Sequence, residues 1–182
     1  MNKVKLENRP VGPFPAALAG AMVDGRPNYA AVGAAGCVCL DPVLYVSLKS
    51  THYTTAGVRK SGYFSINIPS ADLLPQTDFC GLVSGGDRDK AQLFHSFFDA
   101  AGDAPMIEEC PLNFLCKVFQ TTQVRGFEVF FGEVVAAYAS QGAMVDGQPD
   151  VQKIDPIIMM GASYCGVGGV IGHPFAEGKA LL

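Results

Sequence analysis

The chain has 182 residues, the size of one compact domain, and this length predicts a single domain over residues 1–182. Only 16% of the residues are charged, against about 25% in average domains, whereas 49% are hydrophobic, which excludes a disordered chain. The net charge of −4 offers no basic surplus for nucleic acid, and no apolar stretch is long enough to span a membrane.

The first half of the chain is predicted to form short strands joined by turns. Strand-favouring residues alternate with Gly, Pro and Asp-Gly turn signals. The expected elements are a hairpin of strands 17–23 and 29–40 around turn residues Asp24-Gly25 and Pro27-Asn28, a strand over 43–48, a helix over 54–60 that ends at Gly62, and a strand over 63–68.

The second half begins with a predicted helical region and returns to strands. The expected elements are a helix over 71–83 capped by Ser70, a helix over 87–98, a loop over 105–111, strands over 112–122 and 128–138, and a Gly-rich end over 157–182 without a long helix. Val-Asp-Gly-x-Pro occurs at 23–27 and again at 145–149, which predicts two similar hairpin turns. Many short strands and hairpins favour an antiparallel barrel.

The six cysteines point to neither a disulfide framework nor a metal site. No C-x-x-C pair is present, and Cys37 and Cys39, one residue apart, are predicted to face the same side of a strand. We expect most of the cysteines to be reduced core thiols of a cytoplasmic protein. The scarcity of charge also predicts that a second copy of the chain covers part of the surface.

No local motif for catalysis is present, so no catalytic residue is predicted. The three histidines are scattered, and neither G-x-S-x-G, a P-loop nor G-x-G-x-x-G after a strand occurs. One segment, S-L-K-S-T-H-Y-T over 47–54, combines hydroxyls and a cation at a helix start. It is typical of a monophosphate site, and equally of ordinary helix capping by Thr51 or Thr54.

Six segments in chain order carry a resemblance to a known family. They are V-D-G-R-P-N-Y-A-A-V-G (23–33), D-P-V-L-Y-V-S-L (41–48), Y-T-T-A-G-V-R-K-S-G-Y-F-S-I-N-I-P-S (53–70), T-D-F-C-G-L-V-S-G-G-D-R-D-K (77–90), A-P-M-I-E-E-C-P-L-N (104–113) and F-F-G-E-V-V-A (130–136). On these segments, residues 13–181 resemble the flavin reductase-like family, the FMN-binding split barrels that include flavoredoxin.

The resemblance implies a fold, a cofactor and an assembly. The fold is mainly β, a six-stranded antiparallel Greek-key split barrel with added helices. FMN is held noncovalently at a homodimer interface, and NAD(P)H is the usual electron donor. Because hydride passes from the nicotinamide to the flavin, the cofactor supplies the chemistry and the protein needs no dedicated acid or base.

The resemblance also implies which residues bind the cofactor. The loop after the strand over 43–48 follows the flavin ring and ribityl chain, and the start of the next helix takes the phosphate. The assigned residues are Asn28, Ser47, Leu48, Lys49, Thr51, Tyr53, Thr54, Asn67, Cys80 and Lys90. Five of them have a structural alternative: Asn28 in a turn, Lys49 as a surface charge, Asn67 in a structural side-chain bond, Cys80 as a buried thiol, and Lys90 in a surface ion pair.

Three functions follow as hypotheses. The first is an FMN-dependent oxidoreductase that moves electrons from NAD(P)H to free flavin, ferric iron or a protein. The second is an electron carrier of the flavoredoxin type that a protein partner reduces. The third is a split-barrel binding module without cofactor, because fold alone does not fix function.

Overall fold

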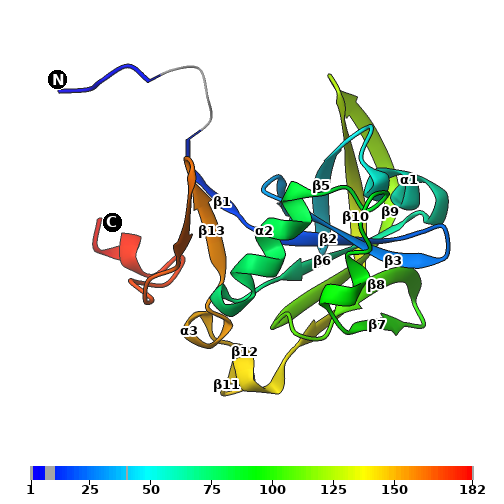
Figure 1. The fold of residues 1–182 in the computed structure, drawn as a ribbon. Coiled ribbons are helices and arrows are strands. Elements are labelled where there is room, and N and C mark those ends of the chain that lie inside the picture. The colour runs from blue at the N-terminus through cyan, green and yellow to red at the C-terminus, as the bar shows by residue number, and fades with distance from the viewer. Residues whose placement is uncertain (1, 7–10, 40, 182) are drawn as a thin grey trace.

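The computed structural model describes residues 2–6, 11–39 and 41–181, and Figure 1 shows a β structure with short helices on its outside. Leu40, the last residue of the predicted strand 29–40, lies outside the described residues. The strands are β1 Pro13–Pro15, β2 Ala17–Val23, β3 Arg26–Val32, β4 Ala35–Cys39, β5 Val43–Lys49, β6 Tyr63–Ile68, β7 Ser96–Asp99, β8 Gly102–Ile107, β9 Leu112–Val124, β10 Phe127–Ala139, β11 Met144–Val145, β12 Gln148–Pro149, β13 Ile157–Met160 and β14 Ser163–Gly166. The helices are α1 Tyr53–Ser61, α2 Leu74–Leu82 and α3 Val151–Ile154, with 3₁₀ turns η1 Ala71–Leu73, η2 Ala91–Leu93, η3 Gln141–Ala143 and η4 Glu177–Leu181.

The main sheet is antiparallel, and its seven strands follow the order β3-β2-β6-β9-β10-β5-β4. Its edge strands, β3 and β4, are consecutive in the chain and are separated only by Gly33 and Ala34. The sheet therefore curls until its first and last strands meet end to end, as a split barrel. Six strands were expected, and the seventh arises because the stretch 29–40 bends at residues 33–34, so that β3 pairs with β2 and β4 with β5.

The hydrophobic core fills the barrel. Alanines at alternate positions of β2 leave room for the rings of Phe64 and Phe130, and Val58 of α1 packs against the same cluster. The buried residues of this cluster are Ala17, Ala19, Ala21, Val32, Ala35, Val46, Leu48, Val58, Phe64, Ile66, Cys116 and Phe130.

The two predicted hairpin turns have the same geometry. The φ angles are 50° and 76° at Asp24 and Gly25, and 49° and 77° at Asp146 and Gly147. Positive φ at both central residues is the two-residue turn that matches strand twist. The prediction that Pro27-Asn28 belongs to the turn is wrong. The two-residue turn needs no more residues, and β3 is an edge strand, which tolerates proline.

The predicted elements between residues 41 and 83 are confirmed with small shifts. The helix over 54–60 is α1, which ends at Gly62 with φ 72°, and the amide of Gly62 donates to the carbonyl oxygen of Val58 at 2.9 Å. Helix α2 begins three residues later than predicted. The side chain of Ser70 makes no capping bond, residues 71–73 form a 3₁₀ turn, and Pro75 stands in the first turn of α2.

Residues 87–111 depart most from the prediction. The helix expected over 87–98 is wrong, because only 91–93 form a 3₁₀ turn before β7. Phe94 packs edge-on against Tyr29, with ring centroids 5.4 Å apart, and this contact overrides the local preference. The loop expected over 105–111 is also wrong in its first half, which belongs to β8. Within this strand, the carbonyl oxygen of Pro105 accepts a hydrogen bond from the hydroxyl of Ser65.

A second sheet of β1, β13 and β14 stands beside the barrel and leads to both ends of the chain (Figure 1). The Gly-rich end has no long helix over the described residues up to 181, as predicted. After β14 the chain runs outward to η4, and Val170, Ile171 and Phe175 on this stretch are largely exposed. Among the described residues, no helix is long and apolar enough to cross a membrane.

Candidate functional site

A cavity of about 260 Å³ lies between β3, the start of α1 and the C-terminal end of α2. Four pieces of chain that are distant in sequence meet there. Its lining consists of residues 30–31 of β3, 51–54 at the start of α1, 80–85 at the end of α2, and Lys90. Hydroxyl groups, a buried cation and small apolar side chains therefore face the same space.

The loop between β5 and α1 is held by hydrogen bonds to the end of β5, to the turn between β9 and β10, and to Arg59 of α1. The amide of His52 and the hydroxyl of Thr55 donate to the carbonyl oxygen of Lys49, at 2.9 and 2.8 Å. The amide of Ser50 donates to the turn between β9 and β10, at Gly126. Arg59 Nη2 donates to the carbonyl oxygen of Ser50 at 2.9 Å. These bonds fix the loop that presents residues 51–54 to the cavity.

Arg59 is itself oriented by a carboxylate on β10. Its guanidinium donates to both oxygens of Glu128, from Nε at 2.8 Å and from Nη2. The hydrogen bonds from Arg59 hold the pKa of the Glu128 carboxyl below its ordinary value. These two hydrogen bonds, here called the Arg59–Glu128 fork, therefore connect α1 to β10 of the barrel. They also orient Arg59 so that it positions the loop.

Asn28 supports the cavity from β3. Its Nδ2 donates to Thr54 Oγ1 at 2.7 Å, and both side chains are buried. Gly85 packs directly on this amide, because a Cβ added at Gly85 would lie 1.8 Å from Asn28 Oδ1. Only glycine fits at residue 85, so the chain after α2 can close over Asn28.

Lys90 is a buried cation at the cavity wall. Its side chain is 4% exposed, and Nζ donates to the carbonyl oxygen of Cys80 at 2.8 Å. Burial lowers the pKa of Lys90 from its ordinary value. Within the described part of the chain, its ammonium forms no ion pair. A buried ammonium without a counter-ion creates a site for an anion.

The start of α1 adds to this positive potential. His52 is the N-cap residue, and no side chain caps the first turn. The amide of Thr55 donates to the carbonyl oxygen of His52 at 3.1 Å, whereas the first two amides, those of Tyr53 and Thr54, have no partner inside the helix. Burial, and next the charges of Lys49 and Lys90, lower the pKa of His52. Of these two lysines, Lys90 lines the cavity together with Thr51 and Thr54.

Cys80 is a buried thiol in the cavity wall. Burial raises its pKa to about 11, and the charge of Lys90 only partly opposes this shift. The thiol is therefore neutral at physiological pH and packs with Tyr29 and Phe94. Cys80 is therefore a buried core thiol, as in its structural alternative, and it also lines the cavity, as in its assignment to the cofactor site.

The structure brings five of the ten predicted site residues to the cavity, and Asn28 adjoins it through Thr54. The three residues on β5 differ: Leu48 lies in the barrel core, Ser47 is half-buried, and Lys49 is exposed and holds the loop through its backbone. The residues that line the cavity are Thr51, Tyr53, Thr54, Cys80 and Lys90.

Asn67 lies elsewhere, in a buried amide network. Its Nδ2 donates to the carbonyl oxygen of Leu18 at 2.9 Å and to Ser65 Oγ at 3.0 Å. Its Oδ1 accepts from the amide of Ile107 at 3.0 Å and from Asn113 Nδ2 at 2.9 Å. All hydrogen-bonding groups of this side chain are used within the fold, which matches its structural alternative.

Several cavity residues were not predicted as a site. Ala30 and Ala31 carry the small apolar side chains of any strand, so the sequence gives no signal for them. Residues 81–85 were interpreted only as the end of a helix. The Gly85-Gly86 pair was a usable signal for the site. A glycine can end a helix, but it can also allow close approach of another group, and Gly85 lies directly against the amide of Asn28.

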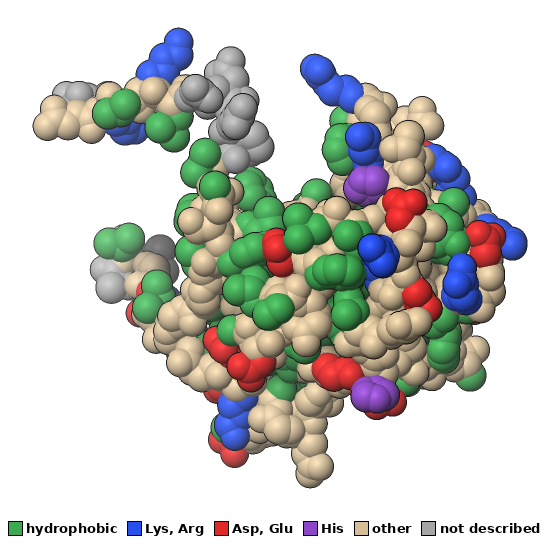
Figure 2. Space-filling view, in the orientation of Figure 1, with side chains coloured by type: hydrophobic (Ala, Val, Ile, Leu, Met, Phe, Trp, Pro, Cys, Tyr) green, Lys and Arg blue, Asp and Glu red, His purple; other side chains and the backbone are tan. Residues whose placement is uncertain are grey.

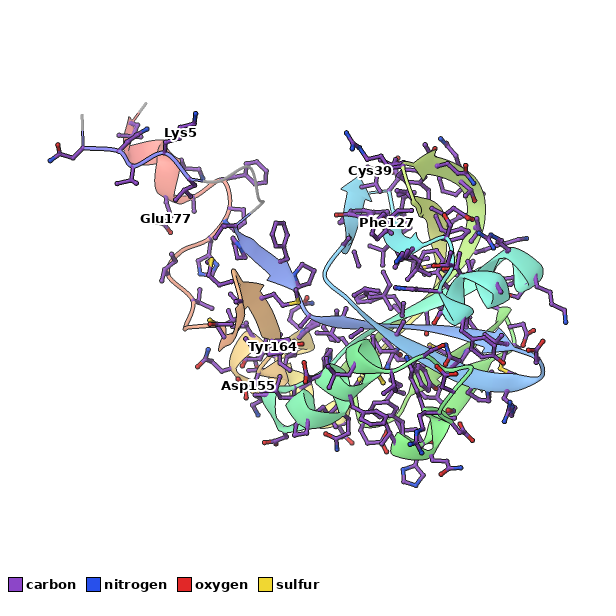
Figure 3. The ribbon with its side chains drawn as sticks, turned by 45° about the horizontal axis from the view of Figure 1, so that its top comes forward. Lys5, Cys39, Phe127, Asp155, Tyr164 and Glu177 are labelled. Carbon is purple, nitrogen blue, oxygen red and sulfur yellow. The ribbon has the colours of Figure 1, made fainter. Side chains whose placement is uncertain are left out.

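A second, uncharged cavity of about 200 Å³ adjoins the first and shares Ala31 and Gly81 with it. Its far wall is the β13–β14 hairpin, where Tyr164 lies beside α2 (Figure 3). The hydroxyl of Tyr164 donates to Asp78 Oδ1 at 2.9 Å, which fastens the hairpin to α2. The groove along α2 thus has a polar, cationic end and an uncharged end.

A family model described as the flavin reductase like domain matches residues 12–167. The chain therefore belongs to the flavin reductase-like family, and the resemblance in its sequence is confirmed. Its mainly β split barrel is the fold of that family.

Two flavoredoxins are among the solved structures that resemble this chain. Flavoredoxin from Methanosarcina acetivorans is 38% identical with a TM-score of 0.94, and the match covers 100% of both chains. Flavoredoxin of Desulfovibrio vulgaris (Miyazaki F) is 30% identical with a TM-score of 0.91, over 97% of this chain and 100% of that one. An FMN-binding protein from Thermus thermophilus, 20% identical over 96% of this chain and 100% of that one, shares the fold with a TM-score of 0.80.

One curated relative matches only in part. It is an uncharacterized protein of Archaeoglobus fulgidus, 26% identical over 112 residues. The match covers 60% of this chain and 62% of that protein. The chain thus spans less than two thirds of this relative's length.

Proposed function

We propose that this protein binds FMN noncovalently in the cavity and passes electrons from NAD(P)H, through the flavin, to free flavin, ferric iron or a redox protein. The observation that carries the proposal is Lys90, a buried ammonium without an ion-pair partner among the described residues, which faces the same cavity as the first turn of α1. Family membership supplies the flavin chemistry to which such a site corresponds.

The donor set fits FMN. A phosphate monoester carries a charge of about −1.5 to −2 at neutral pH. The ammonium of Lys90, the hydroxyls of Thr51 and Thr54 and the amides at the start of α1 would bind the anionic and polar parts of the cofactor. Ala31 and Gly81 offer an uncharged surface to its flat ring.

The protein's own part in the reaction is binding and orientation. Bound FMN supplies hydride acceptance and electron transfer. Asn28 fixes the hydroxyl of Thr54, the Arg59–Glu128 fork fixes the loop over 50–54, and Lys90 offsets negative charge in the cavity. No residue of this set acts as a nucleophile or a proton shuttle, in agreement with the absence of such motifs.

A flavoredoxin-type electron carrier is the second candidate function. The observation in its favour is the likeness to two flavoredoxins, at 38% and 30% identity over nearly the whole chain. In this case a redox protein, and not a nicotinamide, reduces the bound flavin. The site would be the same, and only the electron donor differs.

We also propose a homodimer. Figure 2 shows hydrophobic side chains gathered over α2, where Leu82 is 74% exposed. Ile171 and Phe175, on the chain beyond β14, are 103% and 95% exposed. Apolar surface of this kind on a charge-poor protein supports contact with a second copy.

We place the protein in the cytoplasm. Cys37, Cys39 and Cys165 are exposed free thiols, and a reducing compartment keeps such thiols unpaired. The presence of NAD(P)H in that compartment agrees with the proposed reaction.

Binding and reduction are tested in one experiment. The purified protein is titrated with FMN, and the complex is mixed anaerobically with NADH or NADPH while the flavin absorbance near about 450 nm is followed, because hydride transfer bleaches this band. Rapid bleaching is the expected result, and the faster nucleotide identifies the donor.

Other outcomes separate the alternatives. Tight FMN binding without bleaching by either nucleotide would replace the reductase by the electron carrier. A protein that stays colourless with excess FMN would overturn both and leave the cofactor-free binding module. The Lys90→Met variant serves as the control, since it should lose FMN binding while it keeps the fold.

A further inference from the structure

Thr77 of α2 carries a buried hydroxyl that has no partner among the described residues. The residue is 1% exposed, and its Oγ1 forms no hydrogen bond within this part of the chain. A threonine inside a helix often donates this hydroxyl to the carbonyl oxygen one turn earlier, here that of Leu73, and Thr77 does not. An unpaired buried hydroxyl is costly and rare in folded proteins, so this one marks a group that a ligand can satisfy.

Thr77 lines the uncharged cavity of about 200 Å³ between α2 and the β13–β14 hairpin. The other buried side-chain oxygen without a partner in the described chain, Oε1 of Gln76, belongs to neither cavity of the groove. Tyr164 uses its hydroxyl on Asp78, and the rest of the lining consists of Ala16, Ala31, Val32, Gly33, Gly81 and Met159. Among the described residues of this lining, Thr77 alone therefore has a side-chain oxygen that the fold does not use.

The hydroxyl lies one helical turn from the point where the two cavities adjoin. Gly81 lines both cavities, and Thr77 precedes it by four residues, so the two lie on one face of α2, about 6 Å apart along the helix axis. Lys90 lines the first cavity and not the second. The groove thus leads from a cation, past the small residues Ala31 and Gly81, to a neutral hydroxyl.

FMN has its chemical groups in the same order, an anionic phosphate, a ribityl chain and a flat uncharged ring. With the phosphate at the end of the groove that holds Lys90, the ring extends past Gly81 to Thr77. The pyrimidine edge of the ring carries carbonyl oxygens and nitrogens that accept hydrogen bonds, whereas the opposite edge carries only methyl groups. A hydroxyl donor in this cavity therefore distinguishes the two edges.

We propose that Thr77 donates a hydrogen bond to the pyrimidine edge of bound FMN and so determines which edge of the ring faces α2. The inference rests on the proposed function and adds to it a residue that positions the ring. The pyrimidine edge gains negative charge when the flavin is reduced, and hydrogen bonds to charged acceptors are the stronger ones. Thr77 therefore stabilises reduced FMN more than oxidised FMN, and it raises the reduction potential of the bound cofactor.

The hydroxyl is tested by Thr77→Val, which keeps the shape of the side chain, and by Thr77→Ser, which keeps the hydroxyl. Fluorescence titration with FMN should show an affinity about tenfold lower for Thr77→Val, the equivalent of one hydrogen bond, and close to that of the parent for Thr77→Ser. The apoprotein of Thr77→Val should melt at a higher temperature than the parent, because a methyl group replaces an unpaired buried hydroxyl.

Three other results would contradict the inference. Parental FMN affinity in Thr77→Val would show that the hydroxyl does not reach the cofactor. A Thr77→Val apoprotein that melts below the parent would show that the hydroxyl serves the fold. A parent protein that binds no FMN would instead overturn the proposed function, and the inference with it.

The part of FMN that Thr77 contacts is tested with riboflavin, which lacks the phosphate and keeps the ring. Thr77→Val should weaken the binding of riboflavin and of FMN by the same factor. Lys90→Met is the matched control, because it should weaken FMN binding and leave riboflavin binding unchanged. A Thr77→Val variant that loses affinity for FMN alone would place the hydroxyl at the phosphate and overturn the contact with the ring.

The edge of the ring is tested by the redox state of the flavin. The affinities of the parent and of Thr77→Val are measured anaerobically for oxidised FMN and for chemically reduced FMN. The loss of affinity in Thr77→Val should be at least about threefold larger for reduced FMN, because a hydrogen bond to a charged acceptor contributes more. Equal losses for both forms would overturn the assignment to the pyrimidine edge.

Discussion

Nδ2 of Asn28 donates a hydrogen bond of 2.7 Å to Oγ1 of Thr54, and this bond joins an edge strand of the barrel to the first turn of α1. Because the threonine oxygen is the acceptor here, its own O–H remains able to donate into the cavity. The asparagine thus determines the direction in which the hydroxyl can serve a ligand.

Replacing Thr54 by valine tests this hydroxyl. Valine keeps the shape and removes the donor, so FMN affinity should fall about tenfold, the equivalent of one hydrogen bond of about 1.4 kcal/mol. Isothermal titration with FMN measures the change. The same substitution at Thr121, which is exposed on β9, is the control and should leave affinity as it is. Equal affinity in Thr54→Val and the parent protein would remove Thr54 from the site.

Lys90→Met should have opposite effects on binding and on stability. FMN affinity should fall by about tenfold or more, because a charge-assisted hydrogen bond contributes about 1.5–3 kcal/mol. The apoprotein should melt at a higher temperature than the parent at pH 7, because a buried ammonium without a counter-ion is removed. A variant that loses both binding and stability would show that Lys90 is a structural residue.

The pH dependence of the apoprotein follows from the same lysine. Burial lowers the pKa of Lys90 below its ordinary value of 10.5, so the folded chain holds this proton less tightly than the unfolded chain. Stability should therefore rise with pH through the window between the lowered pKa and 10.5. Thermal melts of the parent and of Lys90→Met should converge as the pH approaches that value. Parallel melting curves across this range would contradict the assignment.

Gly81→Leu should block the groove without harming the fold. A Cβ added at Gly81 meets only the Cβ of Ala31, at 3.4 Å, so a leucine side chain extends into the space shared by both cavities. FMN affinity should fall by at least about tenfold, whereas replacing a helical glycine stabilises the protein by up to about 1 kcal/mol. Gly81→Ala is the matched control and should keep FMN binding. Fluorescence titration of FMN and thermal melts measure both effects.

Asn67→Ala should destabilise the protein and leave the cofactor site intact. The substitution leaves the amide of Ile107 and the carbonyl oxygen of Leu18 buried without their partner, which costs about 3 kcal/mol. Urea unfolding should show this loss, and FMN affinity of the folded fraction should equal that of the parent. A specific loss of FMN affinity with normal stability would instead return Asn67 to the cofactor site.

The exposed chain beyond β14 is tested by the double variant Ile171→Ser and Phe175→Ser. Both side chains are at least 95% exposed, so their replacement removes apolar surface without opening the core. If the proposed homodimer uses this segment, light scattering should show the parent as a dimer and the variant shifted to monomer. A parent protein that is monomeric at micromolar concentration would overturn the homodimer.

Local sequence signals predicted most of the fold, and long-range packing decided the rest. The Asp-Gly turns and the alternating strands were recognisable because they depend on neighbours in sequence. The structure of the stretch 87–107 could not be recognised in this way. Phe94 packs against Tyr29, and Pro105 accepts a hydrogen bond from Ser65, and neither contact can be inferred from a local sequence pattern.

The candidate site divides in the same way. Thr51 and Thr54 could be predicted, because hydroxyls at a helix start carry a chemical meaning of their own. Ala31 and Gly81 could not, since small residues acquire a role only when two elements meet. The assignment of Asn67 shows the limit of residue type, because an amide serves a buried network as well as it serves a ligand.

The pairing of β5 with β10 has a consequence for the order of folding. The two long strands β9 and β10 follow each other in the chain, so they can form a hairpin early, whereas Lys49 of β5 pairs with Phe127, 78 residues further along the sequence. The loop after β5 takes its shape only then, because Ser50 is anchored on Gly126. FMN added during refolding should therefore leave the early phases unchanged and act only by slowing the unfolding of the finished barrel.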